Sequence, residues 1–167
     1  MAAYSDVEID ALISCPKEIC EAPARALKIV DADWRNNAKM QATDGTKGTF
    51  SMFMRKNEDL PENFSVGLRY NGNDGRPEIT LLRCNGKHGT FTGAGDAIHP
   101  HWDFHIHQAT EAAQDAGFTA EKYATKTTAF ASYEQAVQYF LKIVKLTPRD
   151  ASRFFPDTTQ ANLFGSQ

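Results

Sequence analysis

Histidine is concentrated in one short segment of the chain. Four of the five histidines lie between residues 99 and 107, which read HPHWDFHIH. Apolar and polar residues alternate there, as in a strand with one buried face. In such a strand we expect the core to receive Trp102, Phe104 and Ile106. The opposite face then carries a polar set of side chains: His101, Asp103, His105 and His107.

Imidazoles on alternate residues of one strand face lie about 6.6–6.8 Å apart, so two of them can reach one phosphate or one metal ion. An unperturbed imidazole has a pKa of about 6.5, so one ring can be neutral while another is protonated near neutral pH. Such a pair can act as general base and general acid on RNA, whose 2′-hydroxyl supplies the nucleophile. The sequence therefore favours a metal-independent endoribonuclease without a cofactor, with His105, His107 and His101 as catalytic residues.

The same segment allows two other interpretations. Imidazole and carboxylate bind zinc, iron, nickel or manganese, so Asp103, His105 and His107 form an alternative ligand set for a divalent transition metal in a metal-dependent enzyme. The second alternative is a non-catalytic interaction module, such as a phage-defence, antitoxin or immunity protein. The HxH pattern alone does not decide among these three, because many unrelated folds carry it.

Cationic side chains stand at the end of the strand predicted before the histidine segment. Residues 82–89 read LRCNGKHG, which brings Arg83, Lys87 and His88 close together in sequence. If this strand pairs beside the histidine strand, these groups reach the same face, and their composition suits a phosphate. We expect Arg83 to stabilise the charge of the transition state and Lys87 and His88 to bind substrate. Arg69 points away from the core of its own predicted strand and joins the substrate-binding set.

Two segments carry a resemblance to known families. NDGRPEITLLRCNGKHG (residues 73–89) and HPHWDFHIH resemble segments of a family of small bacterial proteins without an assigned function. A more local resemblance is to the TumE-type toxins of bacterial toxin–antitoxin systems. Those toxins carry an arginine-tyrosine-aspartate region, an HPH-like element and a terminal HxH strand. The matching positions in this chain are Arg69, Tyr70, Asp74, His99, Pro100, His101, His105 and His107.

The resemblance to these toxins implies RNA as the substrate and an antitoxin as the protein partner. It also adds Tyr70 to the substrate-binding residues. The chain departs from the toxin pattern at Asp103 and Phe104, where the toxins have proline and histidine. Asp74 is displaced by an Asn-Gly-Asn insertion, and the long helix predicted near the C-terminus has no counterpart in the toxins.

A sheet must position the histidine segment, and period-two patterns predict one. The clearest pattern places Phe64, Val66, Leu68 and Tyr70 on one side of a strand. Turn-forming residues 71–77 follow it, so we expect residues 64–84 to form an antiparallel hairpin. Further strands are expected at residues 26–32, 39–43, 50–55 and 102–107. The glycine-rich residues 85–97 are expected to form a mobile loop.

Helix signals stand at both ends of the chain. Ser5 with Glu8 three residues later is a capping-box pattern, and a second short helical turn is expected at Ile19 and Cys20. Residues 109–116 are expected to form a helix that ends at Gly117. The strongest predicted helix starts after Ser132 and runs to residue 145, and Thr147-Pro148 begins the last one. The apolar face of the helix that starts after Ser132 is expected to bury Val137, Phe140, Leu141 and Val144.

These patterns predict an α+β fold with a mostly antiparallel sheet of about five or six strands and the terminal helices packed on one face. We expect residues 1–156 to form a single domain and residues 157–167 a polar tail. The 167 residues carry 18 basic and 21 acidic side chains, a net charge of −3. RNA binding must therefore come from a local patch, and we expect no DNA partner.

Cysteine usage and hydropathy predict the compartment. Cys15, Cys20 and Cys84 are an odd number without a CxxC pair, which argues against a disulfide framework or a zinc knuckle. Reduced thiols indicate a cytoplasmic protein. No signal-peptide pattern opens the chain, and no apolar run reaches about 18 residues, so we expect no membrane partner.

Overall fold

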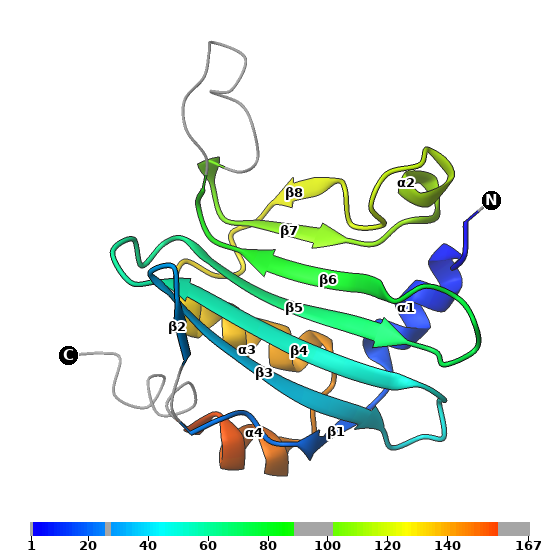
Figure 1. Cartoon of the computed structure of the whole chain (residues 1–167), viewed down its shortest axis with the longest axis horizontal. Helices are drawn as coiled ribbons and strands as arrows, with labels where there is room; N and C mark the ends of the chain where they lie inside the picture. The colour runs from blue at the N-terminus through cyan, green and yellow to red at the C-terminus, as the bar shows by residue number, and fades with distance from the viewer. Residues whose placement is uncertain (1, 26–27, 89–101, 157–167) are drawn as a thin grey trace.

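The computed structural model describes residues 2–25, 28–88 and 102–156. These residues form one antiparallel sheet of eight strands together with four helices (Figure 1). The strands are β1 (Lys17–Glu21), β2 (Lys28–Val30), β3 (Asp33–Ala42), β4 (Thr49–Asn57), β5 (Phe64–Asn71), β6 (Ile79–Asn85), β7 (His105–Gln108) and β8 (Ala124–Lys126). The helices are α1 (Asp6–Ser14), α2 (Glu111–Asp115), α3 (Tyr133–Ile143) and α4 (Pro148–Phe154).

The strands are arranged in the order β1-β3-β4-β5-β6-β7-β8, and β2 pairs with β3. The hairpin expected at residues 64–84 is present as the antiparallel pair β5 and β6. The predicted α+β class is confirmed, but the sheet has more strands than predicted.

Strand β1 corrects one prediction. Ile19 and Cys20 belong to this strand and not to a helical turn, because β1 pairs antiparallel with β3 and Ile19 lies opposite Met40. The backbone of Lys17 is held on its other side as well, since it donates to Lys145 O and accepts from the N–H of Thr147, both at 2.9 Å. The neighbours that fix this strand are therefore distant in sequence.

Helices α1 and α3 cover one face of the sheet, and no described helix covers the other, which we call the open face (Figure 1). The buried face takes alternate residues of the central strands, as the period-two pattern predicted. Phe50 and Met52 in β4 and Val66 in β5 are fully buried, and Phe140 of α3 is fully buried in the same core cluster. All four apolar residues predicted for the core face of the last long helix are buried. Within the described residues, no helix has the length and apolar content needed to cross a membrane.

Helix ends follow the capping signals of the sequence. The Ser5 side chain accepts a hydrogen bond from the N–H of Glu8, and the Ser132 side chain accepts one from the N–H of Gln135. Thr147 caps α4 in the same way, immediately before Pro148. Each cap satisfies an amide that the first helical turn leaves without a partner.

Lys17 is a buried cation that the sequence pattern did not reveal. Its Nζ donates to the carbonyls of Ile13 and Cys15 at 2.8 Å and to that of Val144 at 3.0 Å. These carbonyls belong to the C-terminal ends of α1 and α3, where a positive charge is favourable. Burial lowers the pKa of the Lys17 ammonium, and the nearby Cys15 opposes that shift. This side chain therefore ties two helix ends to β1.

Candidate active site

Two rows of paired residues cross the open face of the sheet from β4 to β8. Side chains in such rows lie on one face, and neighbouring strands are about 4.8 Å apart, so adjacent members of a row are close. The His105 row consists of Arg55, Ser65, Asn85, His105 and Lys126. The His107 row consists of Phe53, Gly67, Arg83, His107 and Ala124. Antiparallel pairing thus brings Arg83 directly beside His107.

The histidine strand is shorter than predicted. It starts at His105, and Trp102 lies before it with 39% of its surface exposed, so the prediction of a buried Trp102 is wrong. Ile106 packs on the core side but is only half-buried, whereas His105 is fully buried. The prediction placed Ile106 in the core and His105 on the polar face, so the order of exposure is the reverse of the expected one. The reason is that neighbouring polar side chains of the open face cover the His105 ring. His99 and His101 lie outside the described residues, as does most of the expected loop at 85–97.

His105 is held by hydrogen bonds at both ring nitrogens. Its Nδ1 lies 2.8 Å from the carbonyl oxygen of Asp103, which can only accept, so Nδ1 carries the proton. Its Nε2 is then an acceptor, 3.4 Å from Asn85 Nδ2 and 3.2 Å from His88 Nε2. The Ser65 hydroxyl donates to Asn85 Oδ1 at 2.7 Å, which turns the Asn85 amino group toward His105. The network therefore fixes the orientation of the His105 ring and holds its Nε2 against His88 and Asn85.

His107 has its tautomer fixed in the same manner. Its Nδ1 lies 2.9 Å from the carbonyl oxygen of Glu121, so the proton resides on Nδ1 and Nε2 is the basic nitrogen. The ring centroids of His105 and His107 are 5.0 Å apart, and so are those of His88 and His105. We call these three rings, from His88, His105 and His107, the histidine cluster.

Arg83 is the cation closest to the histidine cluster in the strand register. Its Nε is buried and has no hydrogen-bond partner among the described residues. Burial lowers the pKa of its guanidinium, and the neighbouring cations Arg55 and Arg69 lower it further, while Glu121 opposes them. Because a guanidinium stays protonated in proteins, the charge remains and is poorly compensated. An anion bound beside Arg83 would relieve this cost.

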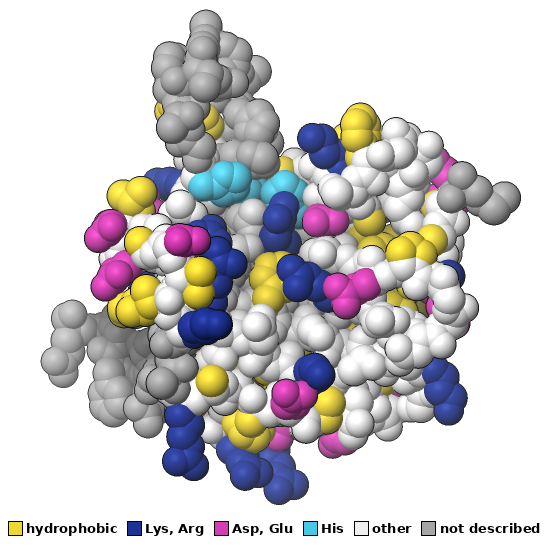
Figure 2. All heavy atoms as spheres, in the orientation of Figure 1, with side chains coloured by type: hydrophobic (Ala, Val, Ile, Leu, Met, Phe, Trp, Pro, Cys, Tyr) yellow, Lys and Arg dark blue, Asp and Glu magenta, His cyan; other side chains and the backbone are white. Residues whose placement is uncertain are grey.

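Other cations surround Arg83 on the open face. Arg55 donates to Asp33 at 3.2 Å and to the Asn63 side chain at 2.8 Å. Arg69 is exposed, and neither Arg69 nor Arg83 has an ion pair within the described part of the chain. Figure 2 shows Lys and Arg side chains gathered over the central strands next to the histidines. Positive side chains therefore gather on this face although the chain has a net charge of −3.

The remaining candidate residues divide between the two faces. Lys87 precedes His88 in the chain, but its side chain contacts other groups: its Nζ lies 3.6 Å from a Glu62 oxygen and 5.2 Å from the centre of the Phe104 ring, which packs against the core. Tyr70 does not reach the site: it is buried on the helix face, and its hydroxyl donates to the carbonyl of Lys47. Its position follows from β5 itself, in which Tyr70 and Arg69 are consecutive and point to opposite faces.

The alternative metal ligands are only partly brought together. The Asp103 carboxylate lies 3.0 Å from Lys126 Nζ. In the described part of the chain, no three His, Cys, Asp or Glu side chains form a group that could hold a metal ion. The thiols of Cys15, Cys20 and Cys84 are free, and burial raises the pKa of Cys84 to about 12, which leaves it protonated at neutral pH.

Comparisons with known proteins give this chain no relative. No protein-family model matches it, and neither a curated protein nor a solved structure does so. The site must therefore be interpreted from its own chemistry.

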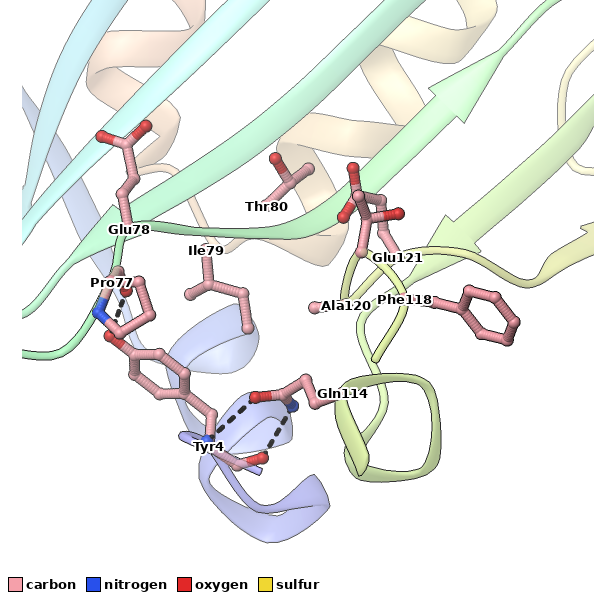
Figure 3. Close-up of a pocket in the computed structure, with 10 residues that line it drawn as sticks. Tyr4, Pro77, Glu78, Ile79, Thr80, Gln114, Phe118, Ala120 and Glu121 are labelled. Atoms are coloured by element: carbon pink, nitrogen blue, oxygen red, sulfur yellow. Dashed lines mark hydrogen bonds between the residues drawn. The ribbon is translucent and has the colours of Figure 1, made fainter. Parts of the chain in front are cut away.

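A pocket of about 320 Å³ lies between the N-terminal segment, the start of β6 and the residues that follow α2 (Figure 3). Thr80 and Glu121 line it together with Tyr4 and Gln114. The N–H of Tyr4 donates to Gln114 Oε1, and Gln114 Nε2 donates to the carbonyl of Tyr4, which ties the N-terminal segment to α2. Glu121 connects this pocket to the histidine cluster, because its backbone carbonyl accepts a hydrogen bond from His107 Nδ1.

Sequence reasoning missed four residues of the site: Ser65, Asn85, Phe53 and Glu121. The first three stand at open-face positions of strands that the pattern did predict, so the pairing register was the missing information. Glu121 contributes a backbone oxygen, for which side-chain type gives no signal.

Proposed function

We propose that the histidine cluster and Arg83 bind a phosphodiester of RNA and cleave it without a metal ion. The observation that carries this proposal is the buried, unpartnered Nε of Arg83 beside a histidine whose basic nitrogen is Nε2. RNA contains its own nucleophile, so a base, an acid and a cation are sufficient for cleavage.

His107 acts as the general base in this proposal. Its Nε2 removes the proton from the 2′-hydroxyl as the 2′-oxygen forms a bond to phosphorus. The bond from phosphorus to the 5′-oxygen of the next nucleotide breaks, and that oxygen receives a proton. The products are a 2′,3′-cyclic phosphate and a free 5′-hydroxyl, and Arg83 neutralises the charge that develops on the phosphoryl oxygens.

His88 acts as the general acid, and His105 is a positioning residue. His105 was expected to be one of the catalytic pair, but its Nε2 already lies within hydrogen-bond distance of Asn85 Nδ2 and His88 Nε2. In this proposal His105 orients the His88 ring, because the two Nε2 atoms lie 3.2 Å apart. His88 is also only half-buried, so it meets solvent.

The test is cleavage of a labelled single-stranded RNA by the full chain after dialysis against EDTA. We expect cleavage to persist, with a bell-shaped dependence of kcat/KM on pH. H107A and H88A should each lose about 10²–10⁴-fold of the rate, and the double variant should lose far less than the product of both. Arg153→Gln, at the exposed end of α4 on the helix side, is the control and should cleave like the unchanged chain.

One contact favours a metal-dependent enzyme as a second candidate. The Nε2 atoms of His88 and His105 lie 3.2 Å apart, close to the separation of about 3.3 Å expected for two nitrogens on one tetrahedral zinc ion. Both His105 and His107 also donate Nδ1–H to a backbone carbonyl, as metal-bound histidines do. Cleavage that EDTA abolishes and zinc or manganese restores would select this candidate.

The interaction module remains the third candidate, with an antitoxin or a phage protein as partner and the cytoplasm as the compartment. Complete absence of RNA cleavage, with and without added metal, would select it over both enzymes.

A further inference from the structure

We infer that the open face holds a stacking site for an unpaired RNA base, formed by Phe53 and Arg69 beside the phosphate site. This inference rests on the proposed function and adds to it that the substrate is single-stranded RNA. It also assigns a role to Phe53 and Gly67, which no catalytic step uses.

The end of the Phe53 ring lies over Gly67, in space that only a glycine leaves free. Phe53 pairs with Gly67 in the strand register, and a Cβ added at Gly67 would overlap the ring. Any larger residue at position 67 would therefore push the ring away from the sheet. Gly67 has no positive φ, so the reason for glycine here is space and not backbone conformation.

Arg69 completes the platform. Its guanidinium carbon lies 4.6 Å from the centre of the Phe53 ring, a cation–π contact. Arg69 is exposed while Phe53 is half-buried, so the guanidinium is the outer group of the pair. RNA bases stack on aromatic rings and on guanidinium planes of this kind.

The platform lies one strand from the phosphate site. Gly67, under the ring, pairs with Arg83, which pairs with His107. Neighbouring strands are about 4.8 Å apart, so a base on the platform can belong to a nucleotide adjoining the phosphate at Arg83. Positive charge at Arg55, Arg69 and Arg83 complements the RNA backbone on both sides of that base.

Single-stranded RNA is the form that this arrangement accepts. In a duplex the faces of the bases are already stacked on their neighbours, so none is available to a flat platform.

The experiment measures binding without cleavage. The probe is a fluorescein-labelled 2′-O-methyl RNA decamer, which lacks the nucleophile, titrated with the full chain by fluorescence anisotropy at fixed salt. F53L and G67A should weaken binding about 5- to 150-fold, the effect of one stacked base. Arg69→Lys keeps the charge but loses the plane, and should weaken binding as well.

Three controls separate stacking from damage to the fold. F53Y keeps the ring and should bind like the unchanged chain. Val7→Ala, at an exposed apolar residue of α1 outside the two rows, should have no effect. The same decamer annealed to its complement should bind more weakly to the unchanged chain and be insensitive to F53L.

Two outcomes overturn the inference: F53L and G67A variants that fold and bind single-stranded RNA like the unchanged chain, or no binding of single-stranded RNA at all. Binding that depends on Phe53 in a protein that never cleaves ordinary RNA supports the platform and refutes the proposed cleavage.

Discussion

At the scale of single residues, the histidine cluster depends on a chain of hydrogen bonds that starts outside it. Ser65 orients Asn85, Asn85 donates to His105, and His105 accepts from His88. Residue types in the sequence indicated the histidines and Arg83 as a group. They did not indicate the order of donors and acceptors, which depends on the pairing of β5 with β6 and of β6 with β7.

Ser65→Ala tests that chain of hydrogen bonds. Loss of the hydroxyl leaves the buried Asn85 Oδ1 without its donor and allows the amide to turn its oxygen toward His105. We expect a loss of about 1–3 kcal/mol in the free energy of unfolding, measured in urea. The pH profile of cleavage should also shift, whereas a purely structural role for Ser65 would leave its shape unchanged.

The free energy of unfolding should depend on pH through Asp33, and the partners of its carboxylate determine the sign. Burial alone would raise the pKa of Asp33, but the hydrogen bond from Asn57 and the Arg55 guanidinium outweigh it and hold the pKa below its ordinary value. A lowered pKa in the folded state means that the unfolded chain binds the proton more readily in acid. The stabilisation is therefore complete above about pH 3.9 and is lost as the pH falls through the folded-state pKa.

Asp33→Asn should accordingly destabilise the protein by about 1.5–3 kcal/mol at pH 7. The difference from the unchanged chain should shrink as the pH falls below about 3.9. Urea unfolding at pH 7 and in acid measures both values, and a difference that is constant with pH would show that the Asp33 charge contributes nothing.

At the scale of elements, strong local patterns were predictable and short strands were not. The β5–β6 hairpin and α3 follow from clear periodicity and end signals. Strand β1 was not predicted, because its buried residue is Lys17 and a strand is recognised by apolar residues at its buried positions. Strand β8 was not predicted because it has only three residues. The length of β7 was overestimated, because alternation continues through Trp102 although pairing with β6 starts at His105.

Phe140→Ala tests the packing of α3 on the sheet. The ring is fully buried in the main core cluster, so its removal leaves a cavity under β5 and β6. We expect a loss of about 3–5 kcal/mol in the free energy of unfolding. A loss well below 1 kcal/mol would mean that α3 contributes little to the core.

At the scale of the whole molecule, the sheet brings together cations that are far apart in the sequence. The open face collects Arg55, Arg69 and Arg83 from three strands, although the chain as a whole is acidic. The sequence showed that any anion site had to be local. Its position required the strand order.

The salt dependence of RNA binding tests whether these cations contact phosphates. Affinity for the 2′-O-methyl RNA should fall with rising salt despite the net charge of −3, because bound phosphates release counterions. Arg83→Gln should reduce the slope of log K against log salt by about 0.7, the contribution of one phosphate on a single strand. An unchanged slope would place Arg83 outside the phosphate contacts.

The central claim is that the histidine cluster cleaves RNA through the 2′-hydroxyl, and one substitution in the substrate tests it most directly. A labelled RNA with one cleavage position is compared with the same RNA carrying a 2′-deoxy residue at that position, in EDTA, with products identified by mass. The account predicts a 2′,3′-cyclic phosphate from the first substrate and an intact second substrate. Cleavage of the deoxy substrate at the same position, or a product that ends in a 3′-hydroxyl, would contradict it.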